Sequence, residues 1–126
     1  MNNENSVSLW LGNMEEATFN EYFEIKYTED GDSIPSSFEE NFKLGYYDRD
    51  LVEKFWAEER SDNIEILLED FSYDNQIIEQ FRSVNLSEGY NTIILIYNYE
   101  YSGNMKTSTY KNGTLNFIGV STYVDE

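Results

Sequence analysis

The sequence predicts a single α+β domain over residues 1–126, in which an antiparallel sheet of about four strands is covered mainly on one face by three to five helices. Three observations support this prediction. An alternating apolar segment lies near the N-terminus, apolar stripes at helical spacing follow, and strand periodicity returns after residue 90. The 21 aromatic residues (11 Tyr, 8 Phe and 2 Trp) supply enough large side chains for the core of one domain.

The first strand is expected over residues 6–12, where apolar and polar positions alternate. Asn13 is then placed to cap a helix that carries Phe19, Tyr22 and Phe23 at helical spacing. This segment therefore predicts a strand followed directly by a helix.

Residues 27–36 are expected to form a loop, because they contain Gly31 and the only proline of the chain. A second helix should follow this loop. Its N-cap is expected to be Ser36 or Ser37, and Gly45 is expected to end it.

A third helix is expected after Asp48 or Asp50, either of which could cap it. Its apolar stripe, which should face the core, consists of Leu51, Val52, Phe55 and Trp56. Residues 64–71 could form a fourth helix, although residues 64–68 could instead form a strand. A last helix is expected after Asp74.

The final third of the chain is expected to form a three-stranded meander over residues 91–123. Its first strand is rich in Ile and Tyr, and Gly103-Asn104 and Asn112-Gly113 are candidate hairpin turns. Asn-Gly is the strongest short-range signal for a hairpin. Together with residues 6–12, the meander gives the predicted sheet of about four strands.

The net charge of −17 is distributed unevenly. Residues 1–70 contain 19 acidic and 5 basic side chains, whereas residues 71–126 contain 6 and 3. Such a field repels phosphates and anionic membranes and attracts basic protein surfaces. A protein partner is therefore expected, and neither a nucleic acid nor a membrane.

The absence of histidine and cysteine removes the usual general base and the usual zinc ligands. No glycine-rich phosphate loop is present, and Asp30-Gly31-Asp32 fails as a calcium loop because Ile34 occupies the next ligand position. We therefore expect no enzyme, no cofactor and no metal. The N-terminus lacks the pattern of a signal peptide, so a cytoplasmic location is expected.

Several segments resemble the bacterial immunity protein 22 family over residues 6–123. They are VSLWLGN, YFEIKYTEDGDSIPSSFEENFKLGYYDRD, ILLEDFSY, YNTIILIYNYEY and LNFIGVSTY. Trp10 and Gly12 match a family-like strand motif, and residues 47–50 match a family-like acidic segment. The resemblance implies an α+β protein that is encoded beside a polymorphic toxin and protects the producing cell by binding it.

The resemblance and the charge together predict a basic cognate toxin domain as the partner, bound by a monomer or weak homodimer. Many such toxins are nucleases, whose basic sites hold phosphates that carboxylates can imitate. Tyrosines beside acids in loops provide rigid anchors for such an interface. The predicted contact residues are Tyr27, Glu29, Asp30, Asp32, Tyr46, Tyr47, Asp48, Asp50, Glu58, Glu59, Glu69, Asp70, Tyr73 and Asp74.

Two other functions are compatible with this composition. A DNA-mimic protein would inhibit a nucleic-acid-binding protein, and it requires carboxylates spaced like phosphates in two rows. A small acidic enzyme or sugar-binding domain requires a concave pocket with convergent polar groups. The arrangement of the acidic residues in the fold distinguishes these classes.

Overall fold

The computed structural model describes residues 5–45 and 47–124, which contain seven strands and four α-helices. The strands are β1 (Ser6–Asn13), β2 (Lys26–Tyr27), β3 (Ser33–Ile34), β4 (Val52–Ser61), β5 (Tyr90–Tyr97), β6 (Thr107–Tyr110) and β7 (Gly113–Thr122). The helices are α1 (Glu16–Tyr22), α2 (Ser37–Phe42), α3 (Ile64–Leu68) and α4 (Asp74–Phe81), with a short 3-10 turn, η1 (Arg49–Leu51), before β4. Five strands form an antiparallel sheet in the order β4-β5-β1-β7-β6, and β2 and β3 form a separate hairpin. The predicted α+β class is confirmed.

The additional strand of the sheet is β4, which lies where the sequence predicts a helix. β4 pairs with β5 from Val52 to Trp56. Because consecutive side chains of a strand point to opposite faces, Trp56 packs against the core while Phe55 is 56% exposed. The predicted helix and the predicted core position of Phe55 are therefore wrong. A short apolar run fits either period, and the pairing with β5 decides between them.

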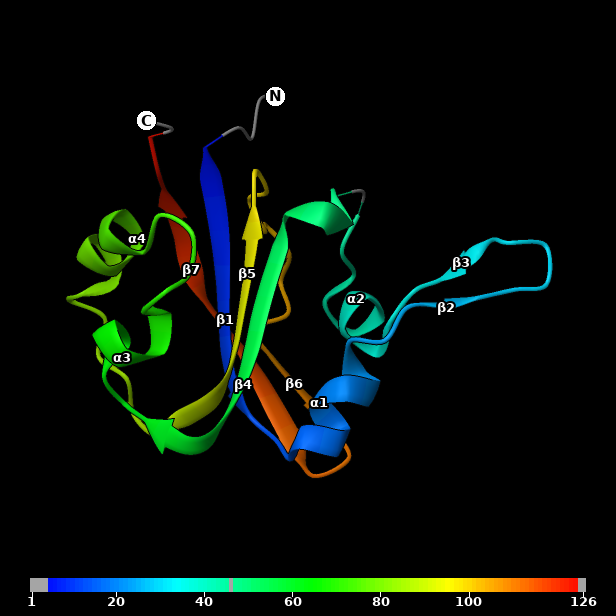
Figure 1. Ribbon diagram of the computed structural model, residues 1–126, viewed down its shortest axis with the longest axis horizontal. Helices are drawn as coiled ribbons and strands as arrows, with labels where there is room; N and C mark the ends of the chain where they lie inside the picture. Colours follow the sequence, from blue (N-terminus) through cyan, green and yellow to red (C-terminus); the bar gives the residue numbers. More distant parts are fainter. Residues whose placement is uncertain (1–4, 46, 125–126) are drawn as a thin grey trace.

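Helices cover both faces of the sheet, which corrects the expectation that they pack mainly on one face (Figure 1). On one face α3 and α4 pack against Leu9 and Leu11 of β1, and on the other face α1 and α2 pack against Trp10. All residues of β5 are buried as well. A strand that is apolar on both sides needs cover on both sides, so the helices divide between the two faces.

The central strand is β1, which pairs with β5 on one side and with β7 on the other. The predicted meander is therefore wrong in its connectivity, since β5 and β6 are not neighbours and Gly103-Asn104 lies in a loop. The hairpin between β6 and β7 is present, but its two loop residues are Lys111 and Asn112, and Gly113 already belongs to β7. Turn signals report local connections, and they do not show that an N-terminal strand inserts between two C-terminal ones.

Trp10 and Gly12 of β1 each have a clear packing role. The Trp10 ring is fully buried and lies 5.2 to 5.8 Å, between ring centroids, from the rings of Phe38, Phe42, Tyr101 and Phe117. At Gly12 a Cβ atom would lie 2.2 Å from the carbonyl oxygen of Thr114. Trp10 therefore organises the aromatic core under α2, and Gly12 permits the close approach of β1 and β7.

The helix boundaries test the predicted caps. Asn13 does not cap α1, because it ends β1 and its amide donates to the carbonyl of Gly89 (2.8 Å). α1 instead follows Glu15. Residues 64–68 form a helix, which settles the open choice, and α4 begins at Asp74. No helix in residues 5–45 and 47–124 is long and apolar enough to span a membrane.

The second predicted helix is confirmed as α2, and Ser36 is its N-cap. The Ser36 hydroxyl accepts from the Glu39 amide (3.1 Å), and the Glu39 carboxylate accepts from the Ser36 amide (2.9 Å), forming a capping box. α2 ends at Phe42, and its C-cap is Lys43, which adopts a positive φ of 54°, and not Gly45. The predicted loop over residues 27–36 contains three of the four pairing residues of the β2–β3 hairpin, namely Tyr27, Ser33 and Ile34.

Candidate partner-binding surface

The structure distributes the predicted contact residues over three regions of the surface. The hairpin region contains Tyr27, Glu29, Asp30 and Asp32. The turn region around η1 contains Tyr47, Asp48 and Asp50. The groove region between β4 and α3 contains Glu59, Glu69 and Asp70. Tyr46 lies outside the described residues, and Glu58, Tyr73 and Asp74 lie outside the three regions.

The hairpin region projects from the body of the molecule at the β2–β3 hairpin (Figure 1). The turn is closed by the Thr28 amide, which donates to the Asp32 carbonyl (2.8 Å), and by the Asp32 amide, which donates to the Thr28 hydroxyl (3.1 Å). Tyr27 is 66% exposed. Within the described part of the chain, the carboxylates of Glu29, Asp30 and Asp32 make no hydrogen bond or ion pair, so all three are available to a partner.

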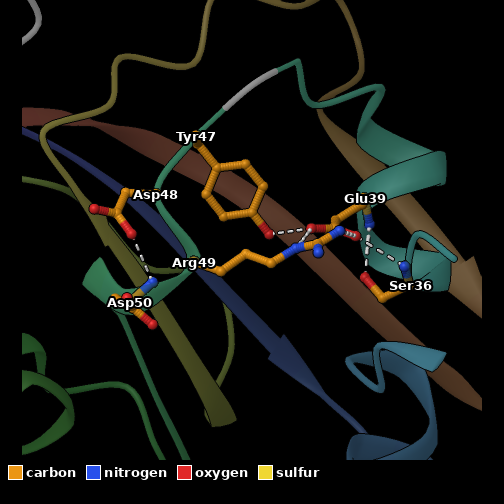
Figure 2. Close-up of polar contacts among 6 residues, drawn as sticks. All are labelled: Ser36, Glu39, Tyr47, Asp48, Arg49 and Asp50. Carbon is orange, nitrogen blue, oxygen red and sulfur yellow. Dashed lines mark hydrogen bonds and ion pairs between the residues drawn. The ribbon is translucent and has the colours of Figure 1, made fainter. Parts of the chain in front are cut away.

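The turn region is held by a buried carboxylate, that of Glu39, which is 5% exposed (Figure 2). Its oxygens accept hydrogen bonds from Arg49 Nε (2.9 Å), Arg49 Nη2 (3.0 Å) and the Tyr47 hydroxyl. Burial by itself would raise the pKa of Glu39. The hydrogen bonds from Arg49, Tyr47 and the Ser36 amide outweigh it, so the pKa lies below its usual range.

Tyr47 has a structural role in this network. Its hydroxyl donates to Glu39, and its ring lies 5.7 Å, between centroids, from that of Tyr99. Burial, and then the hydrogen bond to Glu39, raises the pKa of Tyr47. The tyrosine is half-buried, so its ring offers less surface to a partner than that of Tyr27 does.

The network places Asp48 and Asp50 on either side of Arg49 with both carboxylates exposed (Figure 2). The Asp48 carboxylate accepts from the Asp50 amide (2.9 Å) and caps η1. Pro35 and Asp48 line one open hollow of about 590 Å³ between the base of the hairpin and η1. The base of the hairpin therefore adjoins the turn region across this hollow, which Lys43 and Arg49 also line, whereas Glu29, Asp30 and Asp32 lie at the hairpin turn.

The groove region combines acidic and apolar side chains. A hollow of about 620 Å³ between β4 and α3 is lined by Phe55, Ile66, Glu59, Glu69 and Asp70, among others. Phe55 is 56% and Ile66 60% exposed. Large apolar side chains surrounded by polar ones are typical of protein-binding surfaces.

The sequence did not predict Phe55 and Ile66, the two exposed apolar residues of the groove, as part of the site. Ile66 lies off the stripe formed by Ile64, Leu67 and Leu68, and this offset is a signal for an exposed apolar residue. Phe55 can be found only once the segment is assigned as a strand, because a helical stripe places it in the core.

One wall of the groove is fixed by Glu53 of β4. Its carboxylate accepts from the Ser72 amide (2.9 Å), the Ser72 hydroxyl (2.6 Å) and the Tyr97 hydroxyl (2.9 Å). Burial, and then the hydrogen bond to Glu53, raises the pKa of Tyr97. These bonds tie the segment after α3 to β4, so the groove has a defined shape in the free protein.

The remaining predicted residues lie apart from the groove and make local contacts. Glu58 lies in an irregular stretch of β4 and lines a different hollow, together with Glu88. Asp74 accepts from the Asp70 amide (2.9 Å) at the start of α4. The Tyr73 ring stacks on that of Tyr123 at 4.5 Å.

The described residues offer no ready metal site. Within residues 5–45 and 47–124, no group of three or more acidic side chains is arranged to hold a metal ion. The exposed side chains of the three regions offer a partner charge, hydrogen-bonding groups and apolar contact.

Comparison with known protein families identifies a family for this chain. A family model described as Immunity protein 22 matches residues 7–124, which is almost the whole chain and includes all three regions. No curated protein and no solved structure matches the chain. The resemblance inferred from the sequence is thereby confirmed. The chain belongs to the Immunity protein 22 family.

Proposed function

We propose that this protein neutralises a cognate bacterial toxin domain by binding it stoichiometrically and blocking its activity. The observation that carries the proposal is the family match over residues 7–124, because the family supports a toxin-neutralising role in general. The protein itself acts by occupancy and performs no catalysis.

The proposed partner is basic, and a nuclease domain fits this description best. The net charge of −17 favours encounter with a positive surface and raises the association rate. The hairpin and turn regions supply exposed carboxylates at Glu29, Asp30, Asp32, Asp48 and Asp50. Carboxylates in these positions would occupy the site that the toxin uses for phosphates.

The DNA-mimic alternative has less support. It requires carboxylates in two rows that imitate the strands of a duplex. Most of the acidic residues predicted to contact a partner instead lie in three separate regions, and those of the groove region lie beside the exposed apolar residues Phe55 and Ile66. Apolar anchors inside an acidic rim favour one specific protein partner.

Co-expression with the toxin tests the proposed function. The probe is the C-terminal domain encoded by the toxin gene that adjoins this one, placed under an inducible promoter in a sensitive strain. Growth should be restored by this protein, and an inactivated toxin domain should co-purify with it at a 1:1 ratio. Loss of growth despite abundant soluble immunity protein, with no complex recovered, would reject the proposal.

A further inference from the structure

One edge of the sheet is open to pairing. β4 is the end strand and pairs with β5 on one side. In the described part of the chain, no backbone hydrogen bond is made from the other side of β4. An unpaired edge of this kind can accept an additional strand from another chain.

Two features restrict which part of the edge can pair. The regular register covers Val52 to Trp56, and four residues, 57–60, then lie opposite a single residue of β5. Such an irregularity bends the strand and stops its edge from pairing further. The stretch from Val52 to Trp56 is therefore the part that can accept another strand.

The groove region lies directly beside this stretch. Phe55 points to the face that α3 covers, because its register partner Ile93 packs in the core under α3 and α4. A strand added at the usual spacing of about 4.8 Å would direct every second side chain toward Phe55 and Ile66. Those of these side chains that lie further along the strand would approach Glu59 and Glu69.

The opposite edge of the sheet has a different character. β6 is short, and Lys106 and Lys111 flank it. Lys111 Nζ lies 2.6 Å from Glu21, and Lys106 Nζ lies 5.1 Å from the centroid of the Phe117 ring. Positive charge at both ends of β6 disfavours a basic partner. The groove beside β4 is lined by one lysine, Lys54, and by the four acids Glu53, Glu59, Glu69 and Asp70, so its net negative charge favours a basic partner.

We propose that an extended basic segment of the toxin pairs with β4 at Val52–Trp56 as a sixth strand of the sheet and inserts an apolar side chain into the groove between Phe55 and Ile66. This inference rests on the proposed function, because the occupant is the toxin itself. Backbone pairing supplies the register, the groove supplies the specificity, and the acidic rim selects lysine or arginine beside the inserted side chain.

Amide hydrogen exchange tests the backbone part. The probe is the complex with the inactivated toxin domain, measured by NMR with labelled immunity protein. Alternate residues of an antiparallel strand face the same neighbour. Alternate amides in Val52–Trp56, which exchange in the free protein, should become protected in the complex, and those of β6 should not. Unchanged exchange along β4 in a saturated complex would overturn the inference.

A pair of double variants tests the groove. Phe55→Thr combined with Ile66→Gln removes both exposed apolar side chains and retains residues suited to a strand and a helix. We expect the Kd for the toxin to rise by about thirtyfold, which is typical of the loss of interface hot spots. The matched control, Val120→Thr with Met105→Gln, removes exposed apolar side chains on other elements and should leave the Kd unchanged.

The two proposals fail in distinguishable ways. If the wild type binds the toxin tightly and the groove variant binds equally well, the strand-addition inference is wrong and the neutralising function stands. If the wild type forms no complex, the proposed function itself is wrong.

Discussion

The Arg49 guanidinium forms a two-pronged ion pair with the buried Glu39 carboxylate, with Nε at 2.9 Å from Oε2 and Nη2 at 3.0 Å from Oε1. This pair joins the last turn before β4 to helix α2, and Tyr47 completes it. Because Glu39 also closes the capping box with Ser36, one side chain positions both the hairpin-adjoining helix and the acidic turn.

Replacing Glu39 should destabilise the fold. Glu39→Gln removes the charge on which Arg49 and Tyr47 converge, and we expect a loss of about 1–2 kcal/mol in the free energy of unfolding at neutral pH. The loss stays moderate because Arg49, at 38% exposed, can be solvated by water. Urea denaturation measures it. Glu40→Gln, at the exposed neighbouring position, is the control and should change the stability little.

The same pair predicts a dependence of stability on pH. The folded state holds the pKa of Glu39 below its usual value, so its contribution is fully present above the unfolded pKa of about 4.3 and is lost as the pH falls through the lower folded value. The difference in unfolding free energy between wild type and Glu39→Gln should therefore shrink below this pH. Denaturation curves between pH 3 and pH 7 measure this difference, and a constant gap down to pH 3 would contradict the assignment.

Gly12→Ala should be among the most damaging single changes in the sheet. Its Cβ would lie 2.2 Å from the Thr114 carbonyl oxygen, and backbone cannot move aside as a side chain can. We expect a loss of about 3 kcal/mol or more, at the upper end for overpacked positions. Gly45→Ala is the matched control, because no atom lies within 4 Å of its Cβ. Similar thermal midpoints for the two variants would show that β1 and β7 can separate without penalty.

Tyr27 and Tyr47 should separate binding from stability. Tyr27→Ala removes a 66% exposed ring, so it should leave stability within about 0.5 kcal/mol and raise the toxin Kd by about tenfold. Tyr47→Phe removes only the hydroxyl that donates to Glu39 and should cost about 0.5–1.5 kcal/mol of stability with little change in Kd. Calorimetry and denaturation of both variants check this, and the reverse pattern would exchange their roles.

Charge reversal should show which acids steer association. The test variant carries Asp30→Lys, Asp32→Lys and Asp50→Lys, and it leaves Asp48 to cap η1. The control reverses the exposed acids Glu79, Glu88 and Glu100, so both variants change the net charge equally. The test variant should associate more slowly and with a weaker dependence on salt than the control, as measured by stopped flow. Equal effects would mean that only the overall charge matters.

The elements that the sequence predicted well are those specified by neighbouring residues. The N-cap of α2, predicted at Ser36 or Ser37 and found at Ser36, and the start of α4 at Asp74 depend on a few adjacent positions. The alternation of β1 is equally local. Each of these could be identified without knowledge of the rest of the chain.

The elements that sequence reasoning missed depend on distant pairing. Val52 to Trp56 becomes a strand because β5 offers it an edge to pair with. In the same way, β1 lies between β5 and β7 in the sheet, although most of the chain separates β1 from both strands in sequence. The same limit applied to the surface. The acids could be named from composition, but Phe55 and Ile66 meet only after β4 and α3 are both in place.

A titration of toxin activity with this protein tests whether it blocks the toxin stoichiometrically. The cognate toxin domain, prepared in active form, is assayed with increasing amounts of this protein. The activity of the toxin should fall linearly with the amount of added protein and reach zero at one equivalent, as expected for a tight stoichiometric complex. Full activity in the presence of a large excess of folded immunity protein would contradict it.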